Sequence, residues 1–380
     1  MVTQPPDNHW TSFDRQMMGE ALAVAKKGQY TARPNPMVGC VVVKDKKVVG
    51  RGFHQKSGQA HAEINALAEA GNLAKNAICY VTLEPCAHTG KTGPCAKALV
   101  KAGIKKVIAA MRDPNPLVAG KGFQILLDAG IEVEFGLYQS QAMQLNRGFI
   151  SRVTRGRPWV TCKLAMSVDG RTALANGASQ WITGSAARAD VQRLRARQDA
   201  IITGIGTVLA DNPSLTVRAQ DTDSEIDQWF AEAESYGFQQ PARILLDRQQ
   251  RANTQLKLFN DDTKVYWVSD KTSNQVVDEH IVHMPQAASL EDFLTDLGDN
   301  EIGNLLLESG QKLAGEFLRN GLIDELIIYM APKLMGNQAK GLFDFEVINM
   351  ADTPVLKMTD IRQIGDDIRL TYLLNEKLGG

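Results

Sequence analysis

Cysteine is scarce in this chain of 380 residues, which contains only five, too few for a disulfide framework at this length. Such cysteine use is typical of a reducing compartment, so we expect a cytoplasmic protein whose thiols are buried or bind a metal. Long hydrophobic runs are missing too, since no apolar stretch approaches the roughly 18–20 residues that a membrane helix needs. The first residues also lack the basic end and apolar segment of a secretory signal. The sequence therefore predicts no membrane partner.

A strong net charge is also absent, but the value of −1 hides an asymmetry. Residues 1–155 carry 20 Lys and Arg against 11 Asp and Glu, a net +9, whereas residues 156–380 carry 22 against 32, a net −10. A basic half favours an anionic ligand, either a phosphorylated small molecule or a nucleic acid. Few aromatic residues lie among the basic ones, which counts against stacking on single-stranded nucleic acid.

The length predicts two domains, and the 44% apolar and 22% charged residues are those of a globular protein. The stretch 145–157 is basic and poor in strand patterns, and Pro158 follows it. We therefore expect one domain over residues 1–155 and another over 156–380. The acidic, glutamine-rich stretch 219–240 breaks the pattern of the second half and is expected to be a surface insertion.

Both halves show the alternation of strands and helices that is typical of an α/β fold. Apolar residues at helical spacing predict a helix over 13–27, and "MVGCVVV", "KDKK" and "VVGRGFH" predict a strand, a turn and a return strand. Strands and helices then alternate to residue 137, and a second series follows residue 158. The tail predicts a closing antiparallel hairpin that turns at "GDD".

Three residues of the first half supply the donors of a catalytic zinc site: His61, Cys86 and Cys95. Zinc binds thiolates and imidazole, and a catalytic zinc keeps a position for water, whose pKa it lowers toward neutrality. Glu63 follows His61 at the start of a predicted helix, where a carboxylate can take a proton and pass it to a leaving amine. This set predicts hydrolytic deamination of an amino-substituted ring.

The spacing departs from the general zinc-deaminase signature, H-x-E followed by P-C-x-x-C. Eight residues rather than two separate Cys86 from Cys95. A structural zinc site is the alternative, with His88 as a conceivable fourth ligand. The remaining cysteines lie inside apolar strand patterns and are expected to be buried: Cys40, Cys79 and Cys162.

Polar residues near this set are candidates for holding a phosphorylated base. The turn "AHTGKTG" places His88 and Lys91 among glycines and small residues, a composition suited to a phosphate. Asn35 lies between two prolines, which present its amide stiffly, and His54 is a further candidate phosphate contact. Each of them has the alternative of being a solvated loop residue.

The second half contains two strand–glycine–helix patterns. "NLLLESGQKLAGEFL" predicts a helix N-terminus next to Gly310, where backbone N–H groups can bind a phosphate. "IITGIGTVLADNP" brings Thr207 and Asp211 after a similar turn. Neither is a G-x-G-x-x-G motif, so an ordinary α/β connection explains each alone, but two of them in one sheet favour a dinucleotide site.

"PNPMVGCVVV", "GFHQKSGQAHAE" and "LEPCAHTGKTGPC" resemble the deaminase half of the bifunctional deaminase-reductase family of riboflavin biosynthesis. In that family the eight-residue cysteine spacing is the rule. The resemblance implies a cytidine-deaminase-like three-layer α/β/α domain, with Zn²⁺ on His61, Cys86 and Cys95 and with Glu63 as proton shuttle. It also implies substrate contacts at Asn35, His54, His88 and Lys91.

"KLAMSVDGRTA", "TGIGTVLADNPSLTVR" and "LLLESGQKLAGEFLRNGLIDEL" resemble the reductase half of the family, which has a dihydrofolate-reductase-like α/β fold. The resemblance implies NADPH as the second cofactor, with contacts at Ala165, Trp181, Thr207, Asp211 and Gly310. For the phosphorylated sugar it implies contacts at Ser179, Arg195, Leu215, Arg218 and Glu308. Lys163 is a further polar group at the expected reduction centre and a catalytic candidate.

The resemblance implies two consecutive reactions on one polypeptide, which the family suggests is a homodimer. Zinc-dependent deamination of 2,5-diamino-6-ribosylamino-4(3H)-pyrimidinone 5′-phosphate comes first, and NADPH-dependent reduction of the ribosyl group to ribityl follows. Two alternatives stay open at this stage. One is a tRNA deaminase fused to an unrelated α/β domain, and the other is a non-catalytic protein with a structural zinc.

Overall fold

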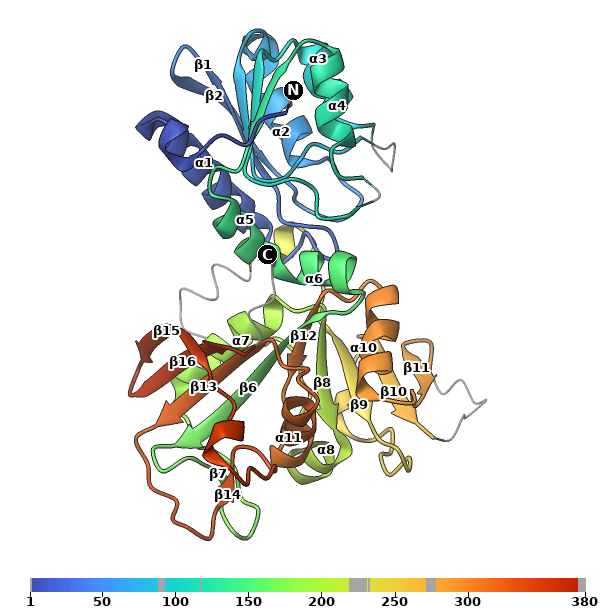
Figure 1. The fold of residues 1–380 in the computed structure, drawn as a ribbon. Helices are drawn as coiled ribbons and strands as arrows, with labels where there is room; N and C mark the ends of the chain where they lie inside the picture. The colour runs from blue at the N-terminus through green and yellow to red at the C-terminus, as the bar shows by residue number, and fades with distance from the viewer. Residues whose placement is uncertain are drawn as a thin grey trace. The chain divides into compact units, whose positions relative to one another are not determined.

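The computed structural model describes residues 2–87, 93–116, 118–218, 231, 233–270 and 278–374 (Figure 1). The chain divides into two units, Met1–Gly156 with Ala233–Gln239 and Arg157–Glu232 with Gln240–Gly380. The segment Ala233–Gln239 therefore belongs to the first unit, although its neighbours in sequence belong to the second. In the described part of the chain, no helix has the length and apolar character needed to cross a membrane.

The first unit is built on a five-stranded sheet in the order β2-β1-β3-β4-β5. Its strands are β1 (Gly39–Lys44), β2 (Lys47–Phe53), β3 (Ile78–Val81), β4 (Lys106–Ala109) and β5 (Glu132–Phe135). Its helices are α1 (Ser12–Ala25), α2 (Ala62–Ala70), α3 (Cys95–Ala102), α4 (Lys121–Asp128), α5 (Gln139–Leu145) and α6 (Arg147–Arg155). β1 is antiparallel to both its neighbours, whereas β3, β4 and β5 are parallel, so the predicted hairpin and alternation are confirmed.

Helices α1 and α2 cover opposite faces of this sheet. Gly52 pairs with the residue after Gly39, so the two glycines point to opposite sides. A Cβ on Gly39 would lie 2.1 Å from the carbonyl oxygen of Ala21 in α1, and one on Gly52 would lie 2.2 Å from that of Ala62 in α2. Glycine thus lets each helix approach the sheet closely, and α2 brings His61, its N-cap residue, against β2.

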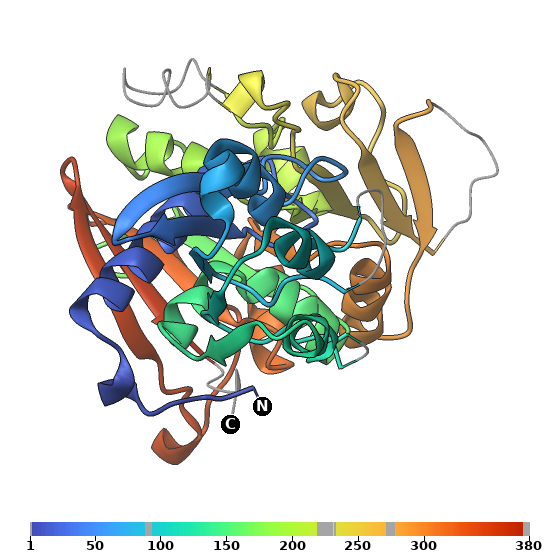
Figure 2. The same ribbon diagram turned by 90° about the horizontal axis from the view of Figure 1, so that it is seen from above.

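The second unit is built on a nine-stranded sheet in the order β11-β10-β9-β8-β12-β6-β13-β16-β15. Its strands are β6 (Trp159–Ser167), β8 (Ala200–Gly204), β9 (Ala242–Leu246), β10 (Val265–Ser269), β11 (Ile281–Pro285), β12 (Asn304–Leu307), β13 (Glu325–Ala331), β15 (Lys357–Ile364) and β16 (Asp367–Leu373). β7 (Arg171–Ala173) and β14 (Lys340–Gly341) form a separate pair. Strands from β11 to β13 are parallel, and the predicted closing hairpin, β15–β16, adds antiparallel strands at one edge (Figures 1 and 2).

Helices cover both faces of this sheet as well: α7 (Ser185–Ala196), α8 (Ile205–Asp211), α10 (Leu290–Asp299) and α11 (Gln311–Arg319). Along β12, Leu305 and Leu307 pack in an apolar cluster with α10 and α11, whereas Leu306 packs in another with α7 and α8. Because successive residues of β12 pack against helices on opposite faces, the unit has three layers, with the sheet between two layers of helices. It also leaves the carboxyl ends of the parallel strands along one edge, where α/β proteins bind ligands.

Candidate active sites

The structure brings His61, Cys86 and Cys95 together, with one donor atom from each lying within 4.8 Å of the others. The sulfur atoms of Cys86 and Cys95 are 3.5 and 3.3 Å from Nδ1 of His61. Tetrahedral zinc with its usual bond lengths would hold sulfur and nitrogen about 3.6 Å apart. The donor set therefore fits zinc, and among the described residues no fourth His, Cys, Asp or Glu joins it.

The loop after β3 is fixed by a buried carboxylate that precedes the first cysteine. Glu84 accepts hydrogen bonds from four backbone N–H groups between residues 113 and 123. In the same region a Cβ on Gly122 would lie 1.8 Å from the carbonyl oxygen of Pro85, so only glycine allows this approach. The N–H of Cys95, at the start of α3, then donates to Sγ of Cys86 over 3.3 Å. These contacts hold both sulfur atoms in place.

Hydrogen bonds within the cluster favour a thiolate. A hydrogen bond with the Cys95 thiol lowers the pKa of Cys86 to about 4, and the opposing effect of burial is smaller than that of the hydrogen bonds combined. The same hydrogen bond raises the pKa of Cys95, and the hydrogen bond with Cys86 raises that of His61. A divalent cation binds deprotonated ligands, and a thiolate beside an imidazole offers such ligands.

Glu63 lies in the first turn of α2 and is only 3% exposed. Burial raises the pKa of its carboxyl to about 7, and the negative charge of Cys86 acts in the same direction. The carboxyl is in hydrogen-bond contact with the Cys95 thiol, so it lies directly beside the metal ligands. A carboxyl that titrates near neutrality can both accept and return a proton.

Asn35 and His54 meet beside this cluster. Nδ2 of Asn35 lies 3.0 Å from Nε2 of His54, whose Nδ1 lies 3.2 Å from the carbonyl oxygen of Ala60. The His54 ring packs edge-on against His61 with 5.2 Å between centroids, and burial lowers the pKa of His54. A neutral ring that donates to Ala60 and accepts from Asn35 satisfies both contacts. The predicted contacts His88 and Lys91 lie outside the described residues.

A buried charge cluster occupies the second unit. The Arg195 guanidinium donates two hydrogen bonds to the Glu308 carboxylate, at 2.6 and 3.0 Å, and Nζ of Lys163 lies 3.8 Å from it. Burial would raise the pKa of Glu308, but Arg195 and Lys163 outweigh it and hold the pKa at about 2. Burial lowers the pKa of Lys163, although Glu308 opposes that effect.

Four other predicted residues form two hydrogen-bonded pairs. The N–H of Gly310, at the start of α11, donates to Oγ1 of Thr207 in α8 over 3.3 Å. Oγ of Ser179 donates to Oδ1 of Asp211 over 3.2 Å. The starts of α8 and α11 therefore lie next to each other. The use of these two turns as a dinucleotide site stays a prediction.

The remaining predicted residues differ in how far the structure connects them to this site. Arg218 acts on the Glu308 carboxylate as a nearby positive charge. Ala165 lies two positions after Lys163 on β6 and therefore on the same face of the sheet. Leu215 is buried in the apolar cluster beneath α7 and α8, and Trp181 is 65% exposed with the Arg188 guanidinium 4.8 Å from its ring centroid.

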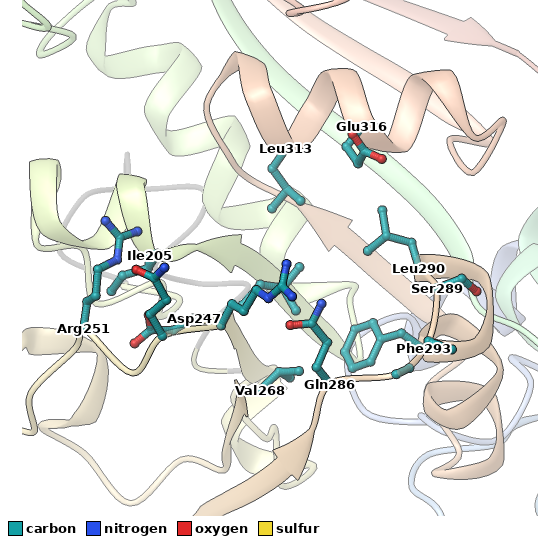
Figure 3. A pocket seen from close by; sticks show the side chains of 15 residues that line it. Ile205, Asp247, Arg251, Val268, Gln286, Ser289, Leu290, Phe293, Leu313 and Glu316 are labelled. Carbon is teal, nitrogen blue, oxygen red and sulfur yellow. The ribbon is translucent and has the colours of Figure 1, made fainter. Parts of the chain in front are cut away.

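A cavity of ≈ 700 Å³ lies at the carboxyl ends of the parallel strands of the second unit (Figure 3). Its polar lining includes Arg248 and Arg251, which follow β9, and Gln286, which follows β11. Apolar walls come from Leu313 in α11 and Phe293 in α10. The sequence interpretation missed these residues, although a charged or polar residue directly after an apolar strand is the feature that indicates them.

Asp247 forms part of the cavity wall and is completely buried. Its Oδ2 accepts hydrogen bonds from Nε1 of Trp267 and from the N–H of Ala252, at 3.2 and 2.8 Å. No described residue donates to its Oδ1. A buried carboxylate oxygen without a partner is costly, so a ligand that offers a hydroxyl or amine there would be stabilised.

Two family models match the chain. Residues 11–111 match the cytidine and deoxycytidylate deaminase zinc-binding region, and residues 158–370 match the RibD C-terminal domain. The riboflavin biosynthesis protein RibD of Haemophilus influenzae is 48% identical over 96% of this chain and 98% of its own length. The chain belongs to the RibD family. Its Escherichia coli relative of the same name is 43% identical over 94% of this chain and 98% of its own length.

Solved structures of the family agree in fold. RibD of Acinetobacter baumannii superposes with a TM-score of 0.88 at 45% identity, covering 96% of this chain and 99% of the other. A Thermotoga maritima diaminohydroxyphosphoribosylaminopyrimidine deaminase/5-amino-6-(5-phosphoribosylamino)uracil reductase gives 0.84 at 31% identity, with the same coverage. The predicted family and fold class, a cytidine-deaminase-like domain followed by a RibD reductase domain, are confirmed. A RibD-family chain is a bifunctional deaminase and reductase of riboflavin biosynthesis, which excludes both alternatives left open by the sequence.

Proposed function

We propose that residues 1–155 deaminate 2,5-diamino-6-ribosylamino-4(3H)-pyrimidinone 5′-phosphate and that residues 156–380 reduce the ribosyl group of the product with NADPH. One observation carries the first step: a zinc-like donor set lies beside a buried carboxyl whose pKa is about 7. The name of the Thermotoga relative gives the same pair of substrates for that protein.

In the proposed deamination, His61, Cys86 and Cys95 would hold Zn²⁺, whose chemistry when bound would be to make a water molecule acidic enough to add to the amino-bearing ring carbon. Glu63 accepts the proton of the attacking water and delivers it to the amino group, which leaves as ammonia while a ring carbonyl forms. Burial raises the pKa of this carboxyl, so it holds a proton more readily than an exposed carboxyl does. The net change is the addition of water and the loss of ammonia.

We assign substrate recognition to the residues beside the cluster. Asn35 and His54 contact each other next to His61, so both can orient the pyrimidine ring over the metal. In the same proposal, His88 and Lys91 bind the substrate phosphate. The positive charge of residues 1–155 would favour an anionic substrate of this kind.

In the proposed reduction, the buried charge cluster binds the open-chain sugar. NADPH, when bound, supplies the hydride that reduces the anomeric carbon. Glu308 remains anionic at neutral pH, so it can accept hydrogen bonds from sugar hydroxyls but cannot supply a proton. Lys163 lies beside it with a lowered pKa and is therefore our candidate proton donor to the sugar oxygen. The other sugar-phosphate contacts that we propose are Ser179, Arg195, Leu215 and Arg218.

We propose that the dinucleotide extends from the two helix starts into the cavity of Figure 3. The nicotinamide and pyrophosphate would contact Ala165, Trp181, Thr207, Asp211 and Gly310. The adenosine would enter the cavity, where the guanidinium groups of Arg248 and Arg251 can bind its 2′-phosphate. A 2′-phosphate is what distinguishes NADPH from NADH, so these two residues would set the preference.

We further propose that the protein is a cytoplasmic homodimer. All five cysteines are free, which suits a reducing compartment such as the cytoplasm.

The proposed dimer has a candidate contact at the edge of the nine-stranded sheet. Strand β15 ends this sheet and exposes 52% of Met358 and 60% of Ile361, so this edge can pair with another chain. Light scattering on the purified protein would show a monomer if the proposal is wrong.

Mass spectrometry of the products tests both steps. With the diaminopyrimidine phosphate alone, we expect an amino group to be replaced by a carbonyl oxygen, with ammonia released. With NADPH added, we expect the same product to gain two hydrogens. Release of ammonia without any reduced product, when NADPH is present, would refute the reductase assignment, and no release of ammonia would refute the deaminase assignment.

A further inference from the structure

The segment Ala233–Gln239 lies in the first unit, between stretches of chain that belong to the second. The stretch 219–240 contains this segment and ends in the second unit. There the side chain of Gln240 hydrogen-bonds both the N–H and the carbonyl oxygen of Val217, at 2.8 and 2.9 Å. Within the segment, the N–H of Phe238 donates to the carbonyl oxygen of Ala233, which is 5% exposed. The segment is therefore a closed turn packed on the deaminase unit.

Three contacts attach this segment to the unit. The Tyr236 ring packs edge-on against Phe53, the last residue of β2, with 5.8 Å between centroids. Nη2 of Arg33 donates to the carbonyl oxygen of Gln239 over 2.9 Å. Lys56 lies against Gly237, where a Cβ would be 2.5 Å from Nζ of that lysine.

These contacts flank the two residues to which we assign the pyrimidine. Phe53 immediately precedes His54, Lys56 follows it by two positions, and Arg33 precedes Asn35 by two positions. Asn35 and His54 come from separate loops, which meet through the 3.0 Å contact between these side chains. The hydroxyl of Thr31 also donates to the carbonyl oxygen of Gln55, and the N–H of His54 donates to the carbonyl oxygen of Val38. The segment contacts both loops from outside and therefore restrains them further, in addition to these direct hydrogen bonds.

We propose that Ala233–Gln239 is a positioning element of the deaminase site, which holds the loops of Asn35 and His54 in the conformation that binds the pyrimidine. The inference rests on the proposed function, because it uses the assignment of these two residues to the substrate. It predicts that the segment affects substrate affinity more than turnover, since the contacts described above join it to Arg33, Phe53 and Lys56 rather than to the catalytic Glu63. Binding groups that are already ordered lose less conformational entropy when the substrate binds. The resulting gain in substrate affinity appears mainly in KM.

The test uses the full-length protein and the variants Tyr236→Ala, Tyr236→Phe and Gly237→Ala. Phe135→Ala is the matched control, because Phe135 pairs with Phe123 at the same 5.8 Å but lies on β5, at the opposite edge of the sheet. For each variant, KM and kcat of ammonia release are measured with the diaminopyrimidine phosphate. Zinc content and the rate of NADPH oxidation with deaminated substrate are measured alongside.

We expect Tyr236→Ala to raise KM for deamination about 3- to 10-fold with kcat nearly unchanged, the range that loss of an aromatic pair gives. Tyr236→Phe keeps the ring and should restore KM, whereas Gly237→Ala, which must accommodate a φ of +79°, should raise it. Zinc content and NADPH oxidation should not change. An unchanged KM in Tyr236→Ala, or an equal rise in Phe135→Ala, would overturn the inference. If the unmodified protein releases no ammonia, the proposed function itself fails, and this inference fails with it.

Discussion

Replacing Glu308 by glutamine should destabilise the second unit in a manner that depends on pH. The pKa of this carboxyl is about 2 in the folded chain, against 4.5 for the unfolded residue, because Arg195 and Lys163 outweigh burial. A depressed pKa stabilises the folded state above the unfolded pKa, and the contribution disappears as pH falls through the folded pKa. The shift corresponds to about 3 kcal/mol at pH 7 and to about 1 kcal/mol at pH 3.

Glutamine resembles the protonated carboxyl in shape but has no charge, so the variant should lose what the ionised group contributes. We expect the free energy of unfolding to differ by about 3 kcal/mol at neutral pH and the difference to shrink as the pH is lowered from about 5 toward 3. Because Glu308 lies in the second unit, the probe must report the unfolding of that unit. In a Trp10→Phe background, the remaining four of the five tryptophans follow residue 156, so their fluorescence serves this purpose.

Urea titrations of the Trp10→Phe protein with and without Glu308→Gln, at several pH values, give the required differences. Glu291→Gln is the control, because this exposed glutamate in the first turn of α10 should give a small difference at every pH. A difference for Glu308→Gln that stays constant with pH, or that is below about 1 kcal/mol at pH 7, would refute the reasoning. The carboxylate would then gain no net stabilisation from its two cations.

Three further outcomes are expected. Glu63→Gln should slow ammonia release about 10²- to 10⁴-fold while zinc content and NADPH oxidation stay unchanged, as assays of each activity on one preparation will show. Cys95→Ser, or treatment with a chelator, should lower zinc content by elemental analysis and abolish ammonia release; added Zn²⁺ should restore the chelated protein only, and NADPH oxidation should persist in both. Arg248→Ala should raise KM for NADPH about ten-fold without changing KM for NADH, and an equal change for both cofactors would contradict the 2′-phosphate assignment.

Local patterns were sufficient to predict several elements of the first unit. The helix over 13–27 corresponds to α1, and the strand–turn–strand prediction corresponds to β1 and β2, with Asp45 and Lys46 in the left-handed region that a tight hairpin turn requires. Cys40, Cys79 and Cys162 are fully buried, as expected from their apolar strands. The donor set His61, Cys86 and Cys95 could be found from sequence because its spacing and its helix starts are local features.

Features that depend on long-range packing escaped prediction. Helix α6 lies in the stretch 145–157, for which the sequence pattern predicted no helix. The helix has three arginines and few buried residues, so its apolar pattern is weak. The cavity beside β9 and β11 forms where separate strand ends meet, and no local pattern records which strands are neighbours. The acidic stretch 219–240 has the composition of a solvated insertion, yet Ala233 within it is buried in the deaminase unit.

Glu63 and Glu308 show why the sequence alone could not assign proton transfer. Both side chains are nearly inaccessible, at 3% and 9% exposure, so burial opposes ionisation of each. The outcomes differ because of the neighbours: at Glu63 burial prevails over His61 and Cys95, which lower the pKa, whereas at Glu308 the charges of Arg195 and Lys163 reverse the effect of burial. Only Glu63 can therefore exchange protons near neutral pH. Glu308 stays ionised, so the proposed reduction needs a proton from another group. Our proposal assigns this role to Lys163, because its ammonium lies 3.8 Å from Glu308 and burial lowers its pKa.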